Sequence, residues 1–219
     1  DGERMLRGLG REFESARLSM KPYPSCRLTH PAVSAALELR DKLGGRLGQV
    51  ELVRIAMGKQ AHDVVGRAVP FRLRPARWLD AQFSVFWTVA VALSQGSLTP
   101  QHLLHQVPPR ADVQAWIERL YAEPMDSAAR DVGACMLEAS GAFGTVSVEA
   151  TEAKGHPDNP LSPQELRQKF AANVALAGVG AEDAARLADR LLALGSAPDV
   201  QSVISALARP QLRSPIEES

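Results

Sequence analysis

Alternating apolar and polar positions predict four short β-strands in the first 150 residues. In the first of them, apolar side chains occupy every second position until two prolines, which cannot donate to a central ladder, end the pattern. The second alternates imperfectly, as a bulged strand does, and the last two flank the turn sequence SGAFG, which is typical of a hairpin. The expected strands cover residues 16–21, 48–58, 131–139 and 144–150.

Helical spacing of apolar residues, with proline near the start and glycine after the end, predicts the helices. The best-bounded helix covers residues 31–43, and the most apolar one covers residues 79–94. Ser162 and Glu165 form a capping-box pattern at the start of a later helix. The other expected helices cover residues 59–65, 98–105, 109–123, 163–177, 181–194 and 200–208.

The order of these elements indicates an α+β fold, because strands and helices are mixed at first and only helices follow the polar stretch at 154–161. We expect a four-stranded, mainly antiparallel sheet with helices, followed by an all-α C-terminal segment. The opening residues, DGERMLRGLGREFE, lack an initiator methionine and carry a helical pattern that two glycines interrupt. We therefore expect the chain to be the C-terminal part of a longer polypeptide.

Composition and charge narrow the function classes. The chain is 45% hydrophobic and 23% charged, as globular proteins are, and its 25 basic and 25 acidic residues give no net attraction for nucleic acid or an anionic membrane. No signal peptide is expected, and the longest apolar stretch, residues 83–93, is too short to span a membrane. Cys26 and Cys135 form no CxxC pair, which favours a reducing compartment and a cytoplasmic location.

The stretch MKPYPSCRLTH, residues 20–30, carries several reactive side chains immediately before a helix start. Lys21, restricted by the neighbouring prolines, is either an acid/base group or a solvated surface lysine. Cys26 is either a nucleophile or a packed thiol. Arg27 either holds a carboxylate or forms a surface salt bridge, and His30 either acts as an acid/base group or caps the helix. Helix starts also bind anions, so the residues alone indicate an anion site in this stretch.

Two further clusters are ambiguous. Ser84, Trp87, Thr88 and Val91 share one face of the most apolar helix. Such a stripe is usually core, but two hydroxyls and an indole can also line a pocket. A histidine and an aspartate in GHPDNP suggest metal ligation, but no third ligand has suitable spacing and the stretch reads as a proline-rich turn. We therefore expect no metal site.

Three segments, in order, resemble the MmgE/PrpD family, which includes 2-methylcitrate dehydratase, cis-aconitate decarboxylase and an iminodisuccinate epimerase. They are MKPYPSCRLTHPAVSAALELR, DAQFSVFWTVAVALSQGSLT and GHPDNPLSPQELRQKF. The resemblance implies a large helical domain and a smaller α+β lid, with the active site between them. On this basis residues 1–18 end the upstream helical domain, 19–153 form the lid, 154–161 are a linker, and 162–219 return to the helical domain.

The resemblance also implies roles for six residues. A lysine at the end of the first expected strand lines the active site in the family, so Lys21 is the expected catalytic residue. The other five are expected to bind substrate: Cys26, Arg27, His30, Ser84 and Trp87.

Three positions depart from relatives in the family. Cys26 stands where the decarboxylase has a histidine. Gln82 and Trp87 stand where the family pattern A-R-F-S-x-P-Y has an arginine and a tyrosine. An indole N–H donates a hydrogen bond but does not act as a proton donor near neutral pH, which disfavours decarboxylation that forms itaconate.

The resemblance therefore implies a lyase that acts on a small di- or tricarboxylic acid, similar to 2-methylcitrate dehydratase of propionate catabolism. The family works without the iron–sulfur cluster of aconitase, and two cysteines are too few to build one, so no cofactor is expected. The expected partners are the upstream helical domain and a second copy in a homodimer, and the 219-residue chain alone is expected to be inactive. The alternatives are an epimerase or isomerase of the same family, and a non-catalytic module for carboxylate binding or oligomerisation, which Gln82 and Trp87 favour.

Overall fold

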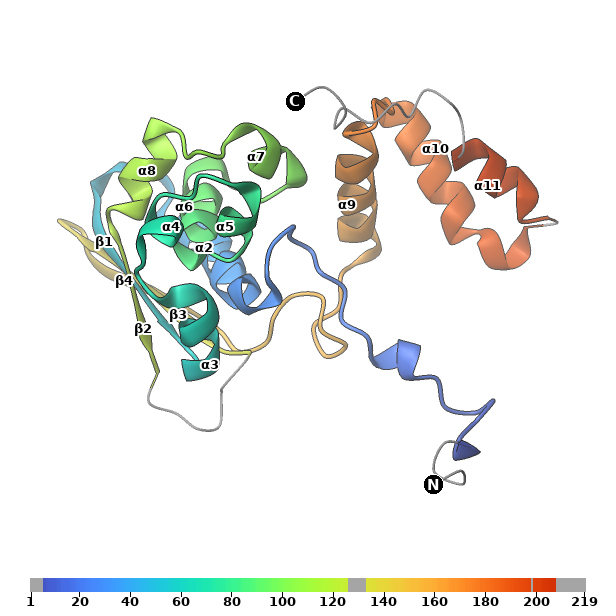
Figure 1. Cartoon of the computed structure of the whole chain (residues 1–219), viewed down its shortest axis with the longest axis horizontal. Helices are drawn as coiled ribbons and strands as arrows, with labels where there is room; N and C mark the ends of the chain where they lie inside the picture. Colours follow the sequence, from blue (N-terminus) through green and yellow to red (C-terminus); the bar gives the residue numbers. More distant parts are fainter. Residues whose placement is uncertain (1–5, 126–132, 198, 208–219) are drawn as a thin grey trace.

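A four-stranded sheet with helices on one face forms the main body of the molecule (Figure 1). The computed structural model describes residues 6–125, 133–197 and 199–207. The C-terminal helices lie to one side, away from the sheet. The strands are β1 (Val50–Met57), β2 (Leu120–Pro124), β3 (Cys135–Gly141) and β4 (Gly144–Ala150), in the order β2-β1-β3-β4.

Antiparallel pairing dominates the sheet. β1 pairs with β3, and β3 with β4, in antiparallel register, whereas β2 runs parallel to β1 at one edge. β3 and β4 form the predicted hairpin, and a shift of register between Val50 and Leu52 is the predicted bulge. Residues 131–132 of the predicted third strand lie outside the described residues. The α+β class with a four-stranded, mainly antiparallel sheet is therefore confirmed.

The core lies between the sheet and two helices, α2 (His30–Leu43) and α6 (Val85–Gln95). Val53 and Ile55 of β1 and Leu137 of β3 are fully buried on this side. They alternate with Arg54 and Glu138, which are half-buried on the other face of the sheet. Side chains along a strand point to opposite faces, so this alternation separates an apolar face from a charged one.

The remaining helices are shorter or lie after the sheet. Between the strands they are α3 (Lys59–Ala61), which continues as a π-helical turn (His62–Gly66), α4 (Pro70–Leu73), α5 (Trp78–Gln82), α7 (Pro100–His105) and α8 (Ala111–Ile117). After the sheet they are α9 (Pro163–Ala175), α10 (Ala181–Leu192) and α11 (Gln201–Leu207). The predicted all-α segment is thus present, and α9 begins with the predicted capping box of Ser162 and Glu165.

The predicted strand at residues 16–21 was wrong. Residues Glu14–Arg17 form a 3-10 turn, and Leu18 and Met20 in the extended backbone that follows are 69% and 55% exposed. Leu18 and Met20 therefore face no core. The prediction failed because side chains point to alternate sides along any extended backbone. An alternating sequence therefore does not reveal whether a partner strand is present.

Two predicted helices also differ from the structure. The helix expected at 79–94 is broken into α5 and α6 at Ser84, whose backbone is extended. The helix expected at 109–123 ends at Ile117, and Leu120–Pro124 forms β2 instead. Parallel pairing with β1 provides hydrogen bonds along one edge of β2, which a pattern confined to one segment cannot show.

Among the residues that the structure describes, no helix combines the length and hydropathy needed to cross a bilayer.

Candidate functional site

The loop before α2 carries most of the predicted site residues and is held by hydrogen bonds to α5. The Cys26 N–H donates to the Gln82 carbonyl (2.9 Å), and the Gln82 side-chain amide donates to the Pro24 carbonyl (3.0 Å). Within the loop, the hydroxyls of Ser25 and Thr29 are bonded to each other (2.8 Å), and the Thr29 hydroxyl donates to the Cys26 carbonyl (2.8 Å). These contacts give the loop a defined shape.

Lys21 lies at the surface where this loop meets the linker. Its side chain is exposed. The N–H of the preceding Met20 donates to the Gly155 carbonyl (2.8 Å), and Pro22 follows. Within the described part of the chain the Lys21 ammonium has neither an ion pair nor a hydrogen bond. Its backbone is therefore fixed on both sides while its charge stays available to a ligand.

His30 lies beneath the loop and is buried. Its Nε2 lies 3.3 Å from the Ser25 carbonyl, and its ring meets Tyr23 edge-on with centroids 5.3 Å apart. The pKa of His30 is lowered from 6.5 to about 4, chiefly by burial; the Ser25 hydrogen bond opposes this shift, and the nearby charges of Lys21 and Arg27 add to it. The ring is therefore neutral near pH 7, with Nε2–H donating to Ser25.

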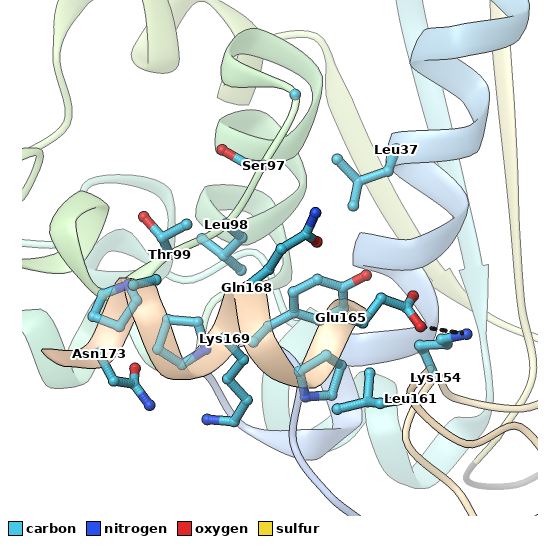
Figure 2. Close-up of a pocket in the computed structure, with 16 residues that line it drawn as sticks. Leu37, Ser97, Leu98, Thr99, Lys154, Leu161, Glu165, Gln168, Lys169 and Asn173 are labelled. Carbon is cyan, nitrogen blue, oxygen red and sulfur yellow. Dashed lines mark ion pairs between the residues drawn. The ribbon is translucent and has the colours of Figure 1, made fainter. Parts of the chain in front are cut away.

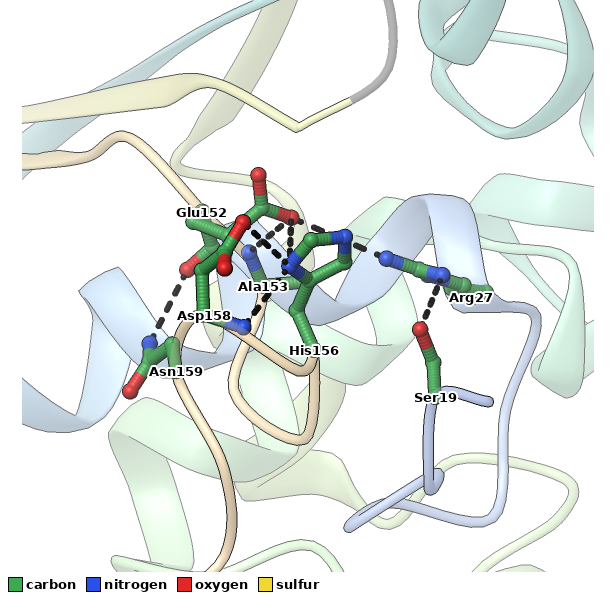
Figure 3. Close-up of polar contacts among 7 residues, drawn as sticks. All are labelled: Ser19, Arg27, Glu152, Ala153, His156, Asp158 and Asn159. Carbon is green, nitrogen blue, oxygen red and sulfur yellow. Dashed lines mark hydrogen bonds and ion pairs between the residues drawn. The ribbon is translucent and has the colours of Figure 1, made fainter. Parts of the chain in front are cut away.

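A polar cluster joins Arg27 to the linker (Figure 3). Arg27 Nη1 donates to the Ser19 hydroxyl (2.8 Å), and Nη2 lies 3.7 Å from Glu152 Oε1. The same oxygen lies 3.8 Å from His156 Nδ1, which also accepts from the Asp158 N–H (3.2 Å). Ser19 and Glu152 were missed from the sequence, because residues so far apart along the chain share no periodic pattern.

The start of α2 offers fewer donors to an anion than its sequence indicates. The Thr29 N–H bonds to the Cys26 carbonyl (2.9 Å), and the His30 N–H bonds to the Arg27 carbonyl. Pro31 has no N–H, and the first helical residues are buried. The parts of this helix start that reach the surface are the half-buried side chains of Cys26, Arg27 and Leu28.

Ser84 and Trp87 lie in the core rather than at the surface, and both are fully buried. The Ser84 hydroxyl donates to the Arg72 carbonyl (2.7 Å) and accepts from the Trp87 N–H (3.0 Å). The indole N–H of Trp87 donates to the Gln106 carbonyl (3.4 Å). Both side chains thus have partners that build the start of α6, and their contact with a substrate stays a prediction.

The structure therefore brings four of the six predicted residues into one loop and its base: Lys21, Cys26, Arg27 and His30. Lys21 and Arg27 supply two cations, which can orient carboxylates, and an amine can also exchange a proton. Among the described residues, no group of three or more His, Cys, Asp or Glu side chains is arranged to hold a metal ion. The His156 cluster is tied to Arg27 instead.

A family model matches most of this chain and tests the family resemblance of its three sequence segments. Residues 23–194 match the MmgE/PrpD C-terminal domain, and this range contains the loop from Tyr23 onward, the whole sheet and helices α9 and α10. No curated protein gives a match. Because the matched range covers most of the chain, the protein belongs to the MmgE/PrpD family and carries its C-terminal domain.

Proposed function

We propose that this chain is part of a lyase that acts on a small di- or tricarboxylic acid without a cofactor, in the manner of 2-methylcitrate dehydratase. The observation that supports the proposal is the pair of cations, Lys21 and Arg27, on one fixed loop of a domain from a family with lyase and isomerase chemistry. The upstream helical domain and a homodimeric assembly belong to the same proposal.

The chemistry requires that negative charge next to a carboxylate be held while a proton moves. In dehydration, a proton leaves the carbon beside a carboxylate, the neighbouring C–O bond breaks, a double bond forms, and the hydroxyl takes up a proton and departs as water. Lys21 gives or takes one of these protons, or anchors a carboxylate. Arg27 holds a second carboxylate, and its 3.7 Å contact with Glu152 is long enough for a substrate to compete. The other acid/base group comes from the helical domain.

Replacement of Lys21 tests the proposal in the full-length polypeptide. Lys21→Ala should lower kcat for 2-methylcitrate dehydration at least about tenfold, because positioned acid–base groups contribute about 10²–10⁴-fold. Lys42→Ala is the matched control, since Lys42 is an exposed lysine of α2 paired with Glu38 at 2.9 Å. An unchanged rate for Lys21→Ala would remove Lys21 from the mechanism. Turnover by the 219-residue chain alone would show that the helical domain is not needed.

A second candidate function is a small-carboxylate-binding or oligomerisation module that has lost the reaction. Two hydrogen bonds favour this function. The Gln82 amide donates to the Pro24 carbonyl and the Trp87 indole N–H donates to the Gln106 carbonyl. Neither side chain therefore supplies a proton to a substrate. Calorimetry with citrate, 2-methylcitrate and cis-aconitate, beside dehydratase and epimerase assays, separates the readings. Binding without turnover supports the module, and conversion between stereoisomers supports an epimerase.

A further inference from the structure

A pocket lies between α9 and the sheet-containing body, apart from the predicted active-site residues (Figure 2). It is enclosed by α9, the loop of Pro22, Tyr23 and Pro24, Leu37 of α2, and the segment 96–100 that follows α6. None of the six residues predicted for catalysis or substrate binding lines it. The pocket therefore needs an explanation of its own.

Most of the lining is apolar, with polar groups at the edges. Pro22, Pro24, Leu98 and Leu161 provide the apolar surface. The Tyr23 hydroxyl is uncharged, and it already has a hydrogen-bond partner in the Ser34 hydroxyl at 3.2 Å. Small-molecule sites typically combine such an apolar lining with a few polar groups that fix the orientation of the ligand.

The charge of the pocket comes from its lysines. The Lys154 ammonium lies 3.1 Å from Glu165 Oε2, which also accepts from the Ser162 N–H at 2.7 Å, so this pair is neutral and fixed. Lys169 of α9 has no ion pair within the described residues. It lies with Asn173 along one side of α9, opposite Gln168 (Figure 2). Lys169 thus brings to the edge of the pocket one positive charge that has no ion-pair partner among the described residues.

We propose that this pocket binds a small amphiphilic monocarboxylate, with its hydrocarbon part on the prolines and leucines and its carboxylate beside Lys169. The pocket has a volume of about 280 Å³, just below the roughly 300–1,000 Å³ that is typical of pockets for drug-sized ligands. A small acid of about ten heavy atoms suits this volume. A single free cation matches a monocarboxylate better than the di- and tricarboxylates of the proposed reaction. This site is therefore distinct from the one around Lys21 and does not depend on it.

A ligand in this pocket contacts α9 on one side and the Pro22–Pro24 loop on the other.

Octanoate, which has ten heavy atoms, is the probe for the 219-residue chain, and octanamide is its uncharged counterpart. Ligand-observed NMR titration should show one saturable site for octanoate and roughly tenfold weaker binding of octanamide, as expected for loss of a charge-assisted contact. Lys169→Gln should bind the two probes equally. Ala172→Phe, which fills the pocket from α9, should weaken both.

Lys21→Gln is the control that separates the two sites. It should leave octanoate binding unchanged whether or not Lys21 is catalytic, so this test can fail while the proposed reaction stands. The inference is overturned if octanoate does not bind at millimolar concentration, if Lys169→Gln still prefers octanoate, or if Lys21→Gln removes binding. The last result would place the anion at the loop before α2.

Discussion

At Gly155 the backbone takes φ = +87°, and a Cβ there would lie 1.9 Å from the Met20 carbonyl oxygen. The carbonyl of the same glycine accepts the Met20 N–H at 2.8 Å. The backbones at Met20 and Gly155 thus approach so closely that only glycine, which has no side chain, fits at position 155. The position of Lys21, next along the chain, depends on this contact.

Gly155→Ala should therefore destabilise the protein by roughly 2–4 kcal/mol, since left-handed backbone strain and overlap with a carbonyl act together. Gly144→Ala is the matched control, because it has the same φ of +87° with nothing within 4 Å of the added Cβ, and should lose only about 1–2 kcal/mol. Urea denaturation of both variants gives the difference. Equal losses would mean that the approach of Met20 is not a constraint.

His30 makes stability depend on pH. Burial holds the pKa of His30 at about 4 in the folded chain against an ordinary value of 6.5, so between these values the unfolded chain binds more protons and stability rises with pH. Acidification from 6.5 to 4 should cost at most about 3 kcal/mol through this residue. In His30→Gln, the urea midpoint should change less with pH between 4 and 6.5 than it does in the parent chain. Parallel pH profiles of the two proteins would refute the assignment.

The reactive residues could be picked out from the sequence, but their surroundings could not. The stretch before α2 was recognisable because a lysine, an arginine and a histidine stand beside two prolines. Exposure of Lys21 and burial of His30 depend on contacts with Gln82 and Gly155, which lie far along the chain. For the same reason Glu152, a partner of Arg27, was not identifiable.

At the scale of single elements, the break between α5 and α6 shows how one hydroxyl can set a boundary. Ser84 caps α6 through the Trp87 N–H and also donates to the Arg72 carbonyl. A run of apolar residues concealed this break, because a buried cap differs from a core residue by its hydrogen bonds and not by its spacing. The edge strand β2 was missed in a similar way, since its partner lies elsewhere in the sequence.

Ser84→Ala should lower the free energy of unfolding by about 1–3 kcal/mol, because α6 loses its cap and a buried carbonyl loses its donor. The Ser162 hydroxyl caps α9 at the surface by accepting the Glu165 N–H at 3.2 Å. Ser162→Ala should therefore lower the free energy of unfolding by only about 1 kcal/mol or less. Chemical denaturation of both variants makes the comparison. A larger loss for Ser162→Ala would contradict the role assigned to the buried hydroxyl.

At the scale of the whole molecule, burial is unevenly distributed. α6 is buried over most of its length, whereas α9 has no fully buried residue and α10 has two, Ala184 and Ala188. The order of an α+β part followed by helices was predictable from the sequence, since it follows from local periodicity. Packing between the two parts was not, because it rests on contacts such as that of Gln101 with the Ala172 carbonyl (3.1 Å).

Hydrogen exchange should reveal this difference. Amides of β1, β3, α2 and α6 should exchange at least about tenfold more slowly than those of α9–α11, because opening free energy follows burial and contact density. Mass spectrometry on peptic fragments, with free peptides as the reference for unprotected amides, measures both sets under the same conditions. Uniform protection along the chain would show instead that the two parts unfold as one cooperative unit.

The contact of Met20 with Gly155 has a further consequence for how such proteins diversify. The chain leaves and returns at this seam, and in between Gln101 and the lining of the α9 pocket also touch the C-terminal helices. A relative's version of this segment, transplanted as one cassette, has to match its host at that seam and along its contacts with α9. Chimeras joined there should fold when the residues that face α9 are kept, whereas divergence elsewhere in the cassette should be tolerated.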